Sequence, residues 1–253
     1  MNVFDYVIIK NDIFKVIYII EEIKEDKALI KGFTKRIRRY VDVDNLELAS
    51  AELINKEKIK STEYISKMKK MKTRLTHKPL FGRILHIDGD LEYLESCKNF
   101  YEEIGIPAEC IYIKEKEVKN KIEELILYLT PDIVVITGHD IYNGKDIKDL
   151  NNYENTSYFI EAVRTIRKHF ENICVIVGAC CSNFDALIAS GANFASSPKR
   201  INIHTYDPAV IAIKVASTSI DKLVDFNSCI KLIENGKDAF GGVETKGKMK
   251  MLL

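Results

Sequence analysis

The stretch Asp132-Ile-Val-Val-Ile136 is typical of a strand buried on both faces, because it is short, β-branched and almost uncharged. The polar residues Thr137-Gly138-His139-Asp140 follow it directly. A second stretch of the same kind, Ile173-Cys-Val-Ile-Val177, is followed by Gly178-Ala179-Cys180-Cys181-Ser182. Side chains just beyond the carboxyl ends of neighbouring parallel strands lie where open α/β sheets bind their ligands. The two stretches therefore decide the fold and place a His and a Cys at its binding edge.

Outward from these stretches, the chain alternates strands and helices from residue 82 onward. Strands are predicted at 83–87, 109–113, 132–136 and 173–177, and helices at 116–129, 154–170, 183–190 and from Asp207-Pro208. Alternation of this length predicts an α/β fold with a doubly wound, mainly parallel sheet and right-handed crossovers. The polar segment 141–156 is predicted to be a long loop beside His139, and such loops often bind substrate.

The first 81 residues differ in pattern from the remainder. Residues 1–52 contain short apolar runs, such as 14–20 and 27–31, separated by charged turns, which predicts a small β-barrel-like module of SH3-like size. Residues 53–81 are rich in Lys and carry only a weak amphipathic stripe, which favours a solvated linker helix. We therefore expect three parts, at 1–52, 53–81 and 82–253.

Composition and charge exclude several classes of protein. The chain of 253 residues is 46% hydrophobic and 30% charged, as in soluble globular proteins, and no apolar run reaches the roughly 20 residues of a membrane span. Its first residues lack the order typical of a signal peptide. Residues 1–82 hold 18 basic and 12 acidic residues, net +6, but no aromatic interleaving accompanies the charge. We expect neither a membrane nor a nucleic-acid partner.

The six cysteines are scattered and show no CxxC spacing, so we expect reduced thiols, no metal site and no cofactor. A thiol becomes a nucleophile when a base takes its proton or when its pKa is lowered, and a turn before a helix N-terminus favours the second effect. Cys180 has that setting, and His139 occupies the matching turn of the preceding strand. The alternative is that Cys180 and Cys181 only fill a tight turn and that His139 is an ordinary loop residue.

The same residues carry a resemblance to a known family. A His after one strand and an Ala-Cys after the next resemble the caspase-type (clan CD) cysteine peptidases. The resemblance is closer to the YabG family of sporulation-specific peptidases and extends over nearly the whole chain. It is carried by Leu85-His-Ile-Asp-Gly-Asp90, 131–140, Gly178-Ala-Cys180, 192–198, Asn202-Ile-His204 and Gly241-Gly-Val-Glu-Thr245.

The resemblance implies a caspase-like fold and a cysteine endopeptidase that processes spore coat and related sporulation proteins. Cys180 is then the nucleophile and His139 the general base, which later protonates the leaving amine. Gly138, Asp140 and Ser182 are expected to support the oxyanion side, together with the N–H of Cys180. Two positions depart from the family patterns: Cys181 stands where Gln is usual, and Asp140 stands where caspase-type enzymes have Gly. The implied location is the cytoplasm of the sporulating cell, with association with the spore coat.

Three acidic residues are candidates for substrate binding. Asp88 and Asp90 end the first strand of the predicted sheet, and Glu244 lies in a Gly-rich stretch, so each is able to accept a basic side chain. The alternative for Asp88 and Asp90 is a simple turn. We hypothesise a preference for basic P1 residues, the residues preceding the cleaved bond, which would make the Lys-rich linker a site of self-cleavage.

Two other functions stay open from the residues alone. One is a Cys-dependent amidase or glutamine-amidotransferase-like enzyme, although Ser182 stands where its Gly-x-Cys-x-Gly turn has the second Gly. The other is a non-enzymatic flavodoxin-like receiver or interaction module, in which Asp88 and Asp90 form the acidic phosphoacceptor cluster. A Lys suitably placed after the last strand is not evident for that function.

Overall fold

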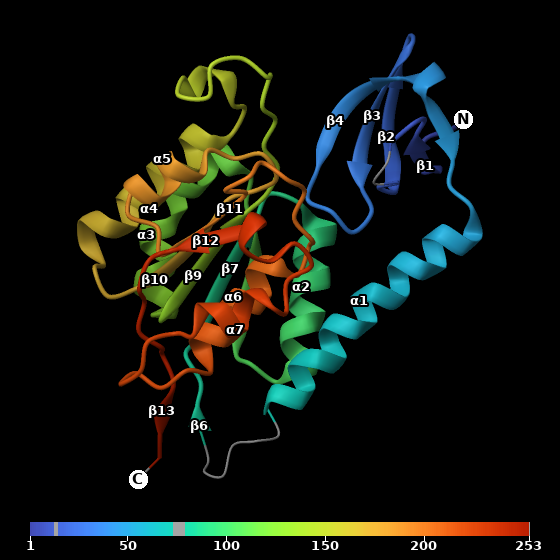
Figure 1. The fold of residues 1–253 in the computed structure, drawn as a ribbon. Helices are drawn as coiled ribbons and strands as arrows, with labels where there is room; N and C mark the ends of the chain where they lie inside the picture. Colours follow the sequence, from blue (N-terminus) through green and yellow to red (C-terminus); the bar gives the residue numbers. More distant parts are fainter. Residues whose placement is uncertain (13–14, 73–78, 253) are drawn as a thin grey trace.

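The structure of the protein, a computed structural model, describes residues 1–12, 15–72 and 79–252. It contains a five-stranded sheet near the N-terminus and a six-stranded sheet flanked by helices. A long helix leads along the chain from the first sheet to the second (Figure 1). The protein is therefore a mixed α/β structure.

The first sheet, called the N-terminal sheet here, is antiparallel throughout, in the order β4-β3-β2-β1-β5. Its strands are β1 (Tyr6–Ile9), β2 (Tyr18–Lys24), β3 (Lys27–Gly32), β4 (Arg38–Asp42) and β5 (Leu46–Leu48), and the short helix η1 (Val43–Asn45) precedes β5. The strand expected at 14–20 begins at Tyr18 and continues to Lys24, because Lys24 still pairs with Lys27 across a tight turn. Residues 13 and 14 lie outside the described residues.

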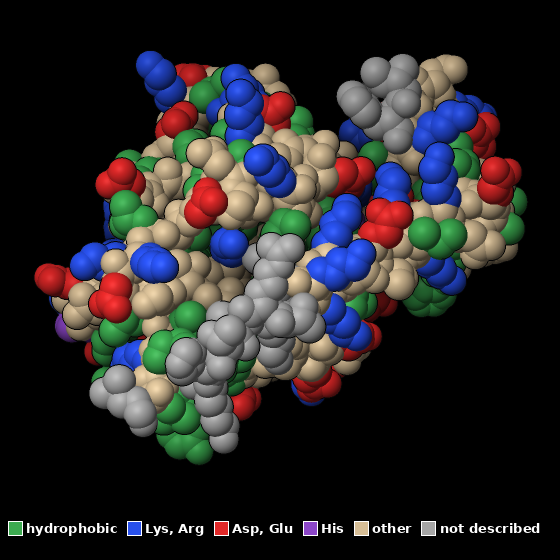
Figure 2. Space-filling model, turned by 60° about the horizontal axis from the view of Figure 1, so that its bottom comes forward, with side chains coloured by type: hydrophobic (Ala, Val, Ile, Leu, Met, Phe, Trp, Pro, Cys, Tyr) green, Lys and Arg blue, Asp and Glu red, His purple; other side chains and the backbone are tan. Residues whose placement is uncertain are grey.

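Helix α1 (Ala51–Lys72) occupies most of the region predicted as a basic linker, of which residues 73–78 lie outside the described residues. Several of its lysines face carboxylates, as in the pairs Lys69–Glu103 at 2.7 Å and Lys60–Glu57 at 3.3 Å. Figure 2 shows Lys and Arg side chains interspersed with Asp and Glu across the face drawn. Tyr64 and Met68 of α1 are buried in the core. The helix is thus packed against the protein along one side.

The six-stranded sheet has the order β12-β11-β10-β9-β7-β8 and is parallel except for β12. Its strands are β7 (Ile84–Asp88), β8 (Ala108–Tyr112), β9 (Ile133–Thr137), β10 (Cys174–Val177), β11 (Phe194–Ser196) and β12 (Phe240–Gly242). A small separate pair joins β6 (Pro79–Leu80) to β13 (Lys250–Met251). The mainly parallel sheet predicted from the alternating pattern is confirmed, and β12 is an antiparallel strand that the pattern did not predict.

Helices cover both faces of this sheet (Figure 1). They are α2 (Leu91–Ile104), α3 (Val118–Leu129), α4 (Thr156–His169), α5 (Phe184–Ala189), α6 (Asp207–Ala216) and α7 (Phe226–Ile230), with the short helices η2 (Glu115–Glu117), η3 (Leu150–Asn152) and η4 (Gly236–Asp238). Alternate strand residues point to opposite faces. Val135 and Ile176 therefore pack with α2 and α6, whereas Val134 and Val175 pack with α3 and α4. In the described residues, no helix is long and apolar enough to cross a membrane.

Candidate active site

His139 and Cys180 follow two strands that lie side by side in the sheet. Ile136 of β9 is paired with Val177 of β10 in a parallel register. Because each candidate residue comes three positions after its paired strand residue, both lie beyond the same carboxyl edge of the sheet, where α/β folds bind ligands. The strands that the two short sequence stretches predicted are therefore neighbours, as a Cys–His pair requires.

The Cys180 thiol is fully buried at this edge. Its Sγ accepts a hydrogen bond from the backbone N–H of Ile203 at 3.3 Å. Burial raises the pKa of Cys180 well above the usual range of a thiol, and this outweighs the lowering effect of nearby Arg36 and Lys35. The expectation that the turn before α5 lowers this pKa is wrong for the conformation described, because the thiol is shielded from solvent.

Cys181 has a different environment from its neighbour. Its φ angle of +64° is in the left-handed region, which residues with a side chain rarely adopt. Its thiol is partly exposed and lies 3.9 Å from the carbonyl oxygen of Arg200. Burial also raises the pKa of Cys181. The turn therefore directs the two adjacent thiols to different partners.

The imidazole of His139 is held by a carboxylate on one side only. Its Nε2 lies 2.9 Å from Oδ2 of Asp90, while Nδ1 is buried and has no hydrogen-bond partner in the described part of the chain. A carboxylate accepts hydrogen bonds, so the proton of the neutral ring belongs on Nε2 and Nδ1 is left as the basic nitrogen. Within the described residues, no hydrogen bond joins His139 to Cys180. Catalytic hydrogen bonds are often long or poorly aligned before substrate binds and tighten only in the complex.

Asp90 is rigidly placed because it also caps a helix. Its Oδ1 accepts hydrogen bonds from the N–H groups of Glu92 and Tyr93 at the start of α2, at 3.0 and 3.1 Å. Burial raises the pKa of Asp90, but the hydrogen bond and charge of His139, with the charge of Lys31, hold it well below its usual range. The geometry supports a role in orienting His139, which differs from the role in substrate binding that the sequence suggested.

Asp88 is fully buried and forms an ion pair. Its Oδ2 lies 2.6 Å from Nη1 of Arg36, which is itself fully buried and belongs to the connection between β3 and β4. The same oxygen accepts a hydrogen bond from Thr137 at 2.7 Å, and Thr137 in turn contacts Nε2 of His86. Burial lowers the pKa of His86 to about 3, so this histidine is neutral. Asp88 therefore lies in a polar network that already accommodates a guanidinium group.

The residues expected on the oxyanion side have contacts that build the turns around the site. Gly138 allows close approach of Glu115, since a Cβ there would lie 2.2 Å from Glu115 Oε1, the oxygen that accepts the N–H of His139 at 2.9 Å. Asp140 accepts the N–H of Asn155 at 2.8 Å at the start of α4, and burial raises its pKa to about 6.

Ser182 and Glu244 lie in different places relative to the candidate pair. The hydroxyl of Ser182 accepts the N–H of Ala179 at 3.0 Å and so closes the turn that carries Cys180. Glu244 is exposed and follows β12, which runs antiparallel to β11, so it lies beyond the opposite edge of the sheet. The direction of β12 therefore places Glu244 away from Cys180, so the structure does not bring it together with the candidate pair.

A surface cavity of about 410 Å³ opens beside His139. It is lined by His139, Arg38, Lys114, Glu115, Glu154, Asn155 and others. The side of the imidazole that faces solvent is therefore reached through a polar opening that includes part of the predicted long loop at 141–156. The Cys180 thiol, in contrast, is fully buried and contacts the backbone N–H of Ile203.

Several residues of this region were not identifiable from the sequence. Tyr93 lies 5.5 Å from the His139 ring between centroids and donates a hydrogen bond to the carbonyl oxygen of Lys35 at 2.8 Å. Arg36 belongs to a basic run with no motif, and Ile203 acts through its backbone. Only Asp90 had a local signal, since an Asp directly before an apolar helix predicts a cap.

In the described residues, no group of three or more His, Cys, Asp or Glu is arranged to hold a metal ion.

The sequence model of the family described as YabG peptidase U57 matches residues 7–253. The chain is also similar to the sporulation-specific protease YabG of Bacillus subtilis (strain 168), with 41% identity over 175 residues. These residues are 67% of this chain and 60% of the relative, so the match spans less than two thirds of the relative's length. With a family match over almost its entire length, the chain belongs to the YabG peptidase U57 family.

Proposed function

We propose that the protein is a cysteine endopeptidase in which Cys180 is the nucleophile and His139 the general base and acid. The single observation that carries this proposal is the β9–β10 register, which places the two residues beyond adjacent strand ends at one edge of the sheet. Family membership supports peptidase activity. The caspase-like architecture that the resemblance implies is part of this proposal, and the largely parallel sheet flanked by helices supports it.

The reaction proceeds by transfer of the Cys180 proton to Nδ1 of His139, as Sγ forms a bond to the scissile carbonyl carbon. The backbone N–H of Cys180 donates to the oxyanion that develops on the carbonyl oxygen. His139 then gives its proton to the leaving amine as the C–N bond breaks, which leaves a thioester. Water hydrolyses the thioester and restores the thiol. Asp90 accepts from Nε2 and keeps His139 in the tautomer that this sequence of steps requires.

The site favours a basic P1 side chain. Asp88 is buried next to Thr137 and already forms an ion pair with the guanidinium of Arg36. A buried carboxylate needs a cationic partner, because an unpaired charge in the interior is costly. Arg or Lys at P1 therefore satisfies Asp88 when the substrate takes the place of Arg36, whereas an apolar P1 side chain in that place would leave Asp88 unpaired.

The substrates we propose are spore coat and related sporulation proteins, processed in the cytoplasm of the sporulating cell or at the spore coat. The similar Bacillus subtilis protein is named a sporulation-specific protease, which supports this assignment. We also propose that the basic linker at 53–81 is a site of self-cleavage. The exposed lysines of α1 support this, since basic P1 residues are the proposed target.

The test is cleavage of coat-protein extracts by the purified wild type, Cys180→Ala and Cys181→Ala. Cys180→Ala is expected to lose all cleavage, and Cys181→Ala, the adjacent matched control, is expected to retain most of it. Full cleavage by Cys180→Ala would overturn the assignment. Hydrolysis of small amides without cleavage of polypeptides would favour the amidase alternative. The buried ion pair of Asp88 argues against its use as a phosphoacceptor.

A further inference from the structure

The connection between β3 and β4, residues 33–37, leaves the N-terminal sheet and pairs with the segment that follows β11. We call it the β3–β4 loop. Lys35 and His204 form an antiparallel β-bridge. The N–H of Arg36 donates to the carbonyl oxygen of Ile203 at 2.9 Å, and the N–H of Thr205 donates to that of Thr34 at 2.9 Å. Extended peptides bind proteins in this way, with main-chain hydrogen bonds for affinity and pockets for side chains.

This pairing brings the β3–β4 loop next to the nucleophile. Ile203 accepts the N–H of Arg36 through its carbonyl oxygen and donates its own N–H to the Cys180 thiol at 3.3 Å. One residue of the 201–205 segment therefore contacts both Arg36 and Cys180. The charges of Arg36 and Lys35 are close enough to act on the thiol and favour its ionised form. An extended chain bound here therefore pairs with the residue whose own N–H contacts the Cys180 thiol.

The side chain of Arg36 fills a closed pocket. Its Nη1 pairs with Asp88 at 2.6 Å, its Nε donates to the carbonyl oxygen of Thr205 at 3.2 Å, and Nη2 lies 3.6 Å from Sγ of Cys97. The guanidinium also lies 5.2 Å from the ring centroid of Tyr93. Arginine is suited to such a site because its planar group donates several hydrogen bonds in fixed directions. The pocket thus matches the P1 specificity proposed above.

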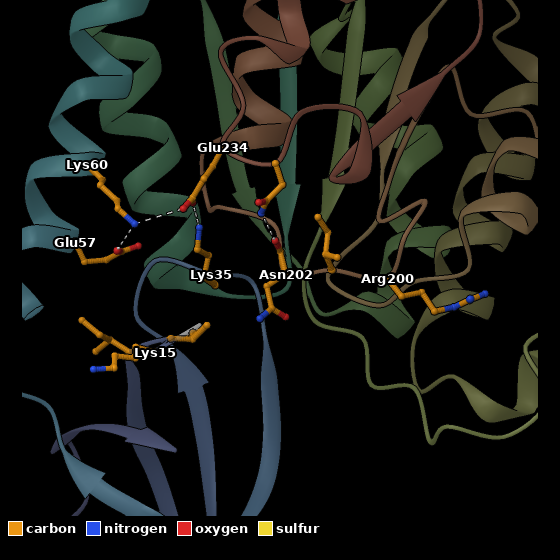
Figure 3. Close-up of a pocket in the computed structure, with 11 residues that line it drawn as sticks. Lys15, Lys35, Glu57, Lys60, Arg200, Asn202 and Glu234 are labelled. Atoms are coloured by element: carbon orange, nitrogen blue, oxygen red, sulfur yellow. Dashed lines mark hydrogen bonds and ion pairs between the residues drawn. The ribbon is translucent and has the colours of Figure 1, made fainter. Parts of the chain in front are cut away.

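Two lysines near the β3–β4 loop, Lys35 and Lys31, form ion pairs on either side of the site. Lys35 is buried and pairs with Glu234, which also lies 3.4 Å from Lys60 of α1 (Figure 3). A cavity of about 340 Å³ lies beside Lys35, between the N-terminal sheet, α1 and the 200–202 segment (Figure 3). Lys31, at the end of β3, pairs with Asp90 at 3.1 Å, the carboxylate that holds His139. The N-terminal sheet therefore contacts the partners of both proposed catalytic residues.

We propose that the β3–β4 loop occupies the substrate groove as an internal substrate mimic, with Arg36 in the P1 pocket formed around Asp88, Cys97 and Tyr93. The proposal rests on the peptidase function proposed above and extends it to regulation. A substrate with Arg at P1 must displace the loop to reach Cys180. The N-terminal sheet then acts as a competitive inhibitor within the chain, and its release activates the enzyme.

The first test compares wild type, Arg36→Ala and Lys27→Ala. Lys27 is the matched control, because it lies at the opposite end of β3 and its side chain forms an exposed ion pair with Asp42. Arg36→Ala is expected to cleave a peptide with Arg at P1, and to react with iodoacetamide at Cys180, at least about tenfold faster than wild type. Lys27→Ala is expected to match wild type. A folded Arg36→Ala protein with unchanged or slower rates of both reactions would overturn the proposal.

The second test uses the wild-type chain and so does not depend on the folding of a variant. A peptidyl-arginyl electrophile is attached to Cys180, and amide hydrogen exchange is compared with the unlabelled protein. The β3–β4 loop amides are expected to exchange faster in the labelled protein, because the bound arginine replaces Arg36. Equal protection in both proteins would show that loop and ligand occupy different places. Both outcomes that would overturn the loop proposal differ from the outcome that would overturn the proposed function. The latter is cleavage retained by the Cys180→Ala variant.

Discussion

Asp90 offers the sharpest test of the site, because its two carboxylate oxygens make different contacts. Oδ1 caps α2, and Oδ2 holds Nε2 of His139 at 2.9 Å. Asp90→Ser keeps a good capping oxygen but removes the contact with His139, whereas Asp90→Ala removes both. A hydrogen bond to a charged group contributes about 1.5–3 kcal/mol. If it acts in the transition state, its loss lowers kcat by about 10- to 150-fold.

The assay is hydrolysis of a peptide with Arg at P1, with kcat and KM measured separately and stability followed by denaturant unfolding. Both Asp90 variants are expected to lose kcat equally, with KM almost unchanged, while Asp90→Ala is about 1 kcal/mol less stable than Asp90→Ser. Lys31→Ala is the matched control, because it removes the ion pair to Asp90 and leaves the His139 contact. Its kcat is not expected to fall. A kcat for Asp90→Ser within twofold of wild type would refute the orienting role.

The remaining predictions concern specificity, acid stability and processing. Asp88→Asn is expected to lower the ratio of kcat/KM for a peptide with Arg at P1 to that for a peptide with Leu at P1, and an unchanged ratio would refute the role of Asp88 in specificity. The same substitution is expected to destabilise the fold by about 3–5 kcal/mol, because Arg36 stays buried without its counter-charge. Burial lowers the pKa of His86 to about 3, so the unfolded chain binds a proton below about pH 6.5 that the folded chain does not. The free energy of unfolding is therefore expected to fall by about 2 kcal/mol between pH 7 and pH 5 because of this group. Denaturant unfolding of His86→Gln at the two pH values is expected to lack this loss. N-terminal sequencing of stored enzyme is expected to find new ends within 53–81 in the wild type and none in Cys180→Ala.

Much of the fold follows from local sequence patterns. The β-branched runs 132–136 and 173–177 form adjacent buried strands, and the helices begin and end within a few residues of their predicted limits. These features are local, because side-chain periodicity and capping depend on residues only a few positions apart. Less was predictable at the edges of the sheet. The antiparallel direction of β12, which removes Glu244 from the site, depends on packing against β11.

The sequence by itself determined the parallel sheet and the two strand ends that carry His139 and Cys180. Only the tertiary structure decided what surrounds them. Arg36 and Asp88 are 52 residues apart in the chain, and Ile203 reaches the Cys180 thiol through a backbone N–H that no side-chain pattern encodes. Contacts of this kind arise when separate units pack together, and packing depends on shape and charge in three dimensions. For this reason the covered nucleophile became visible only in the fold.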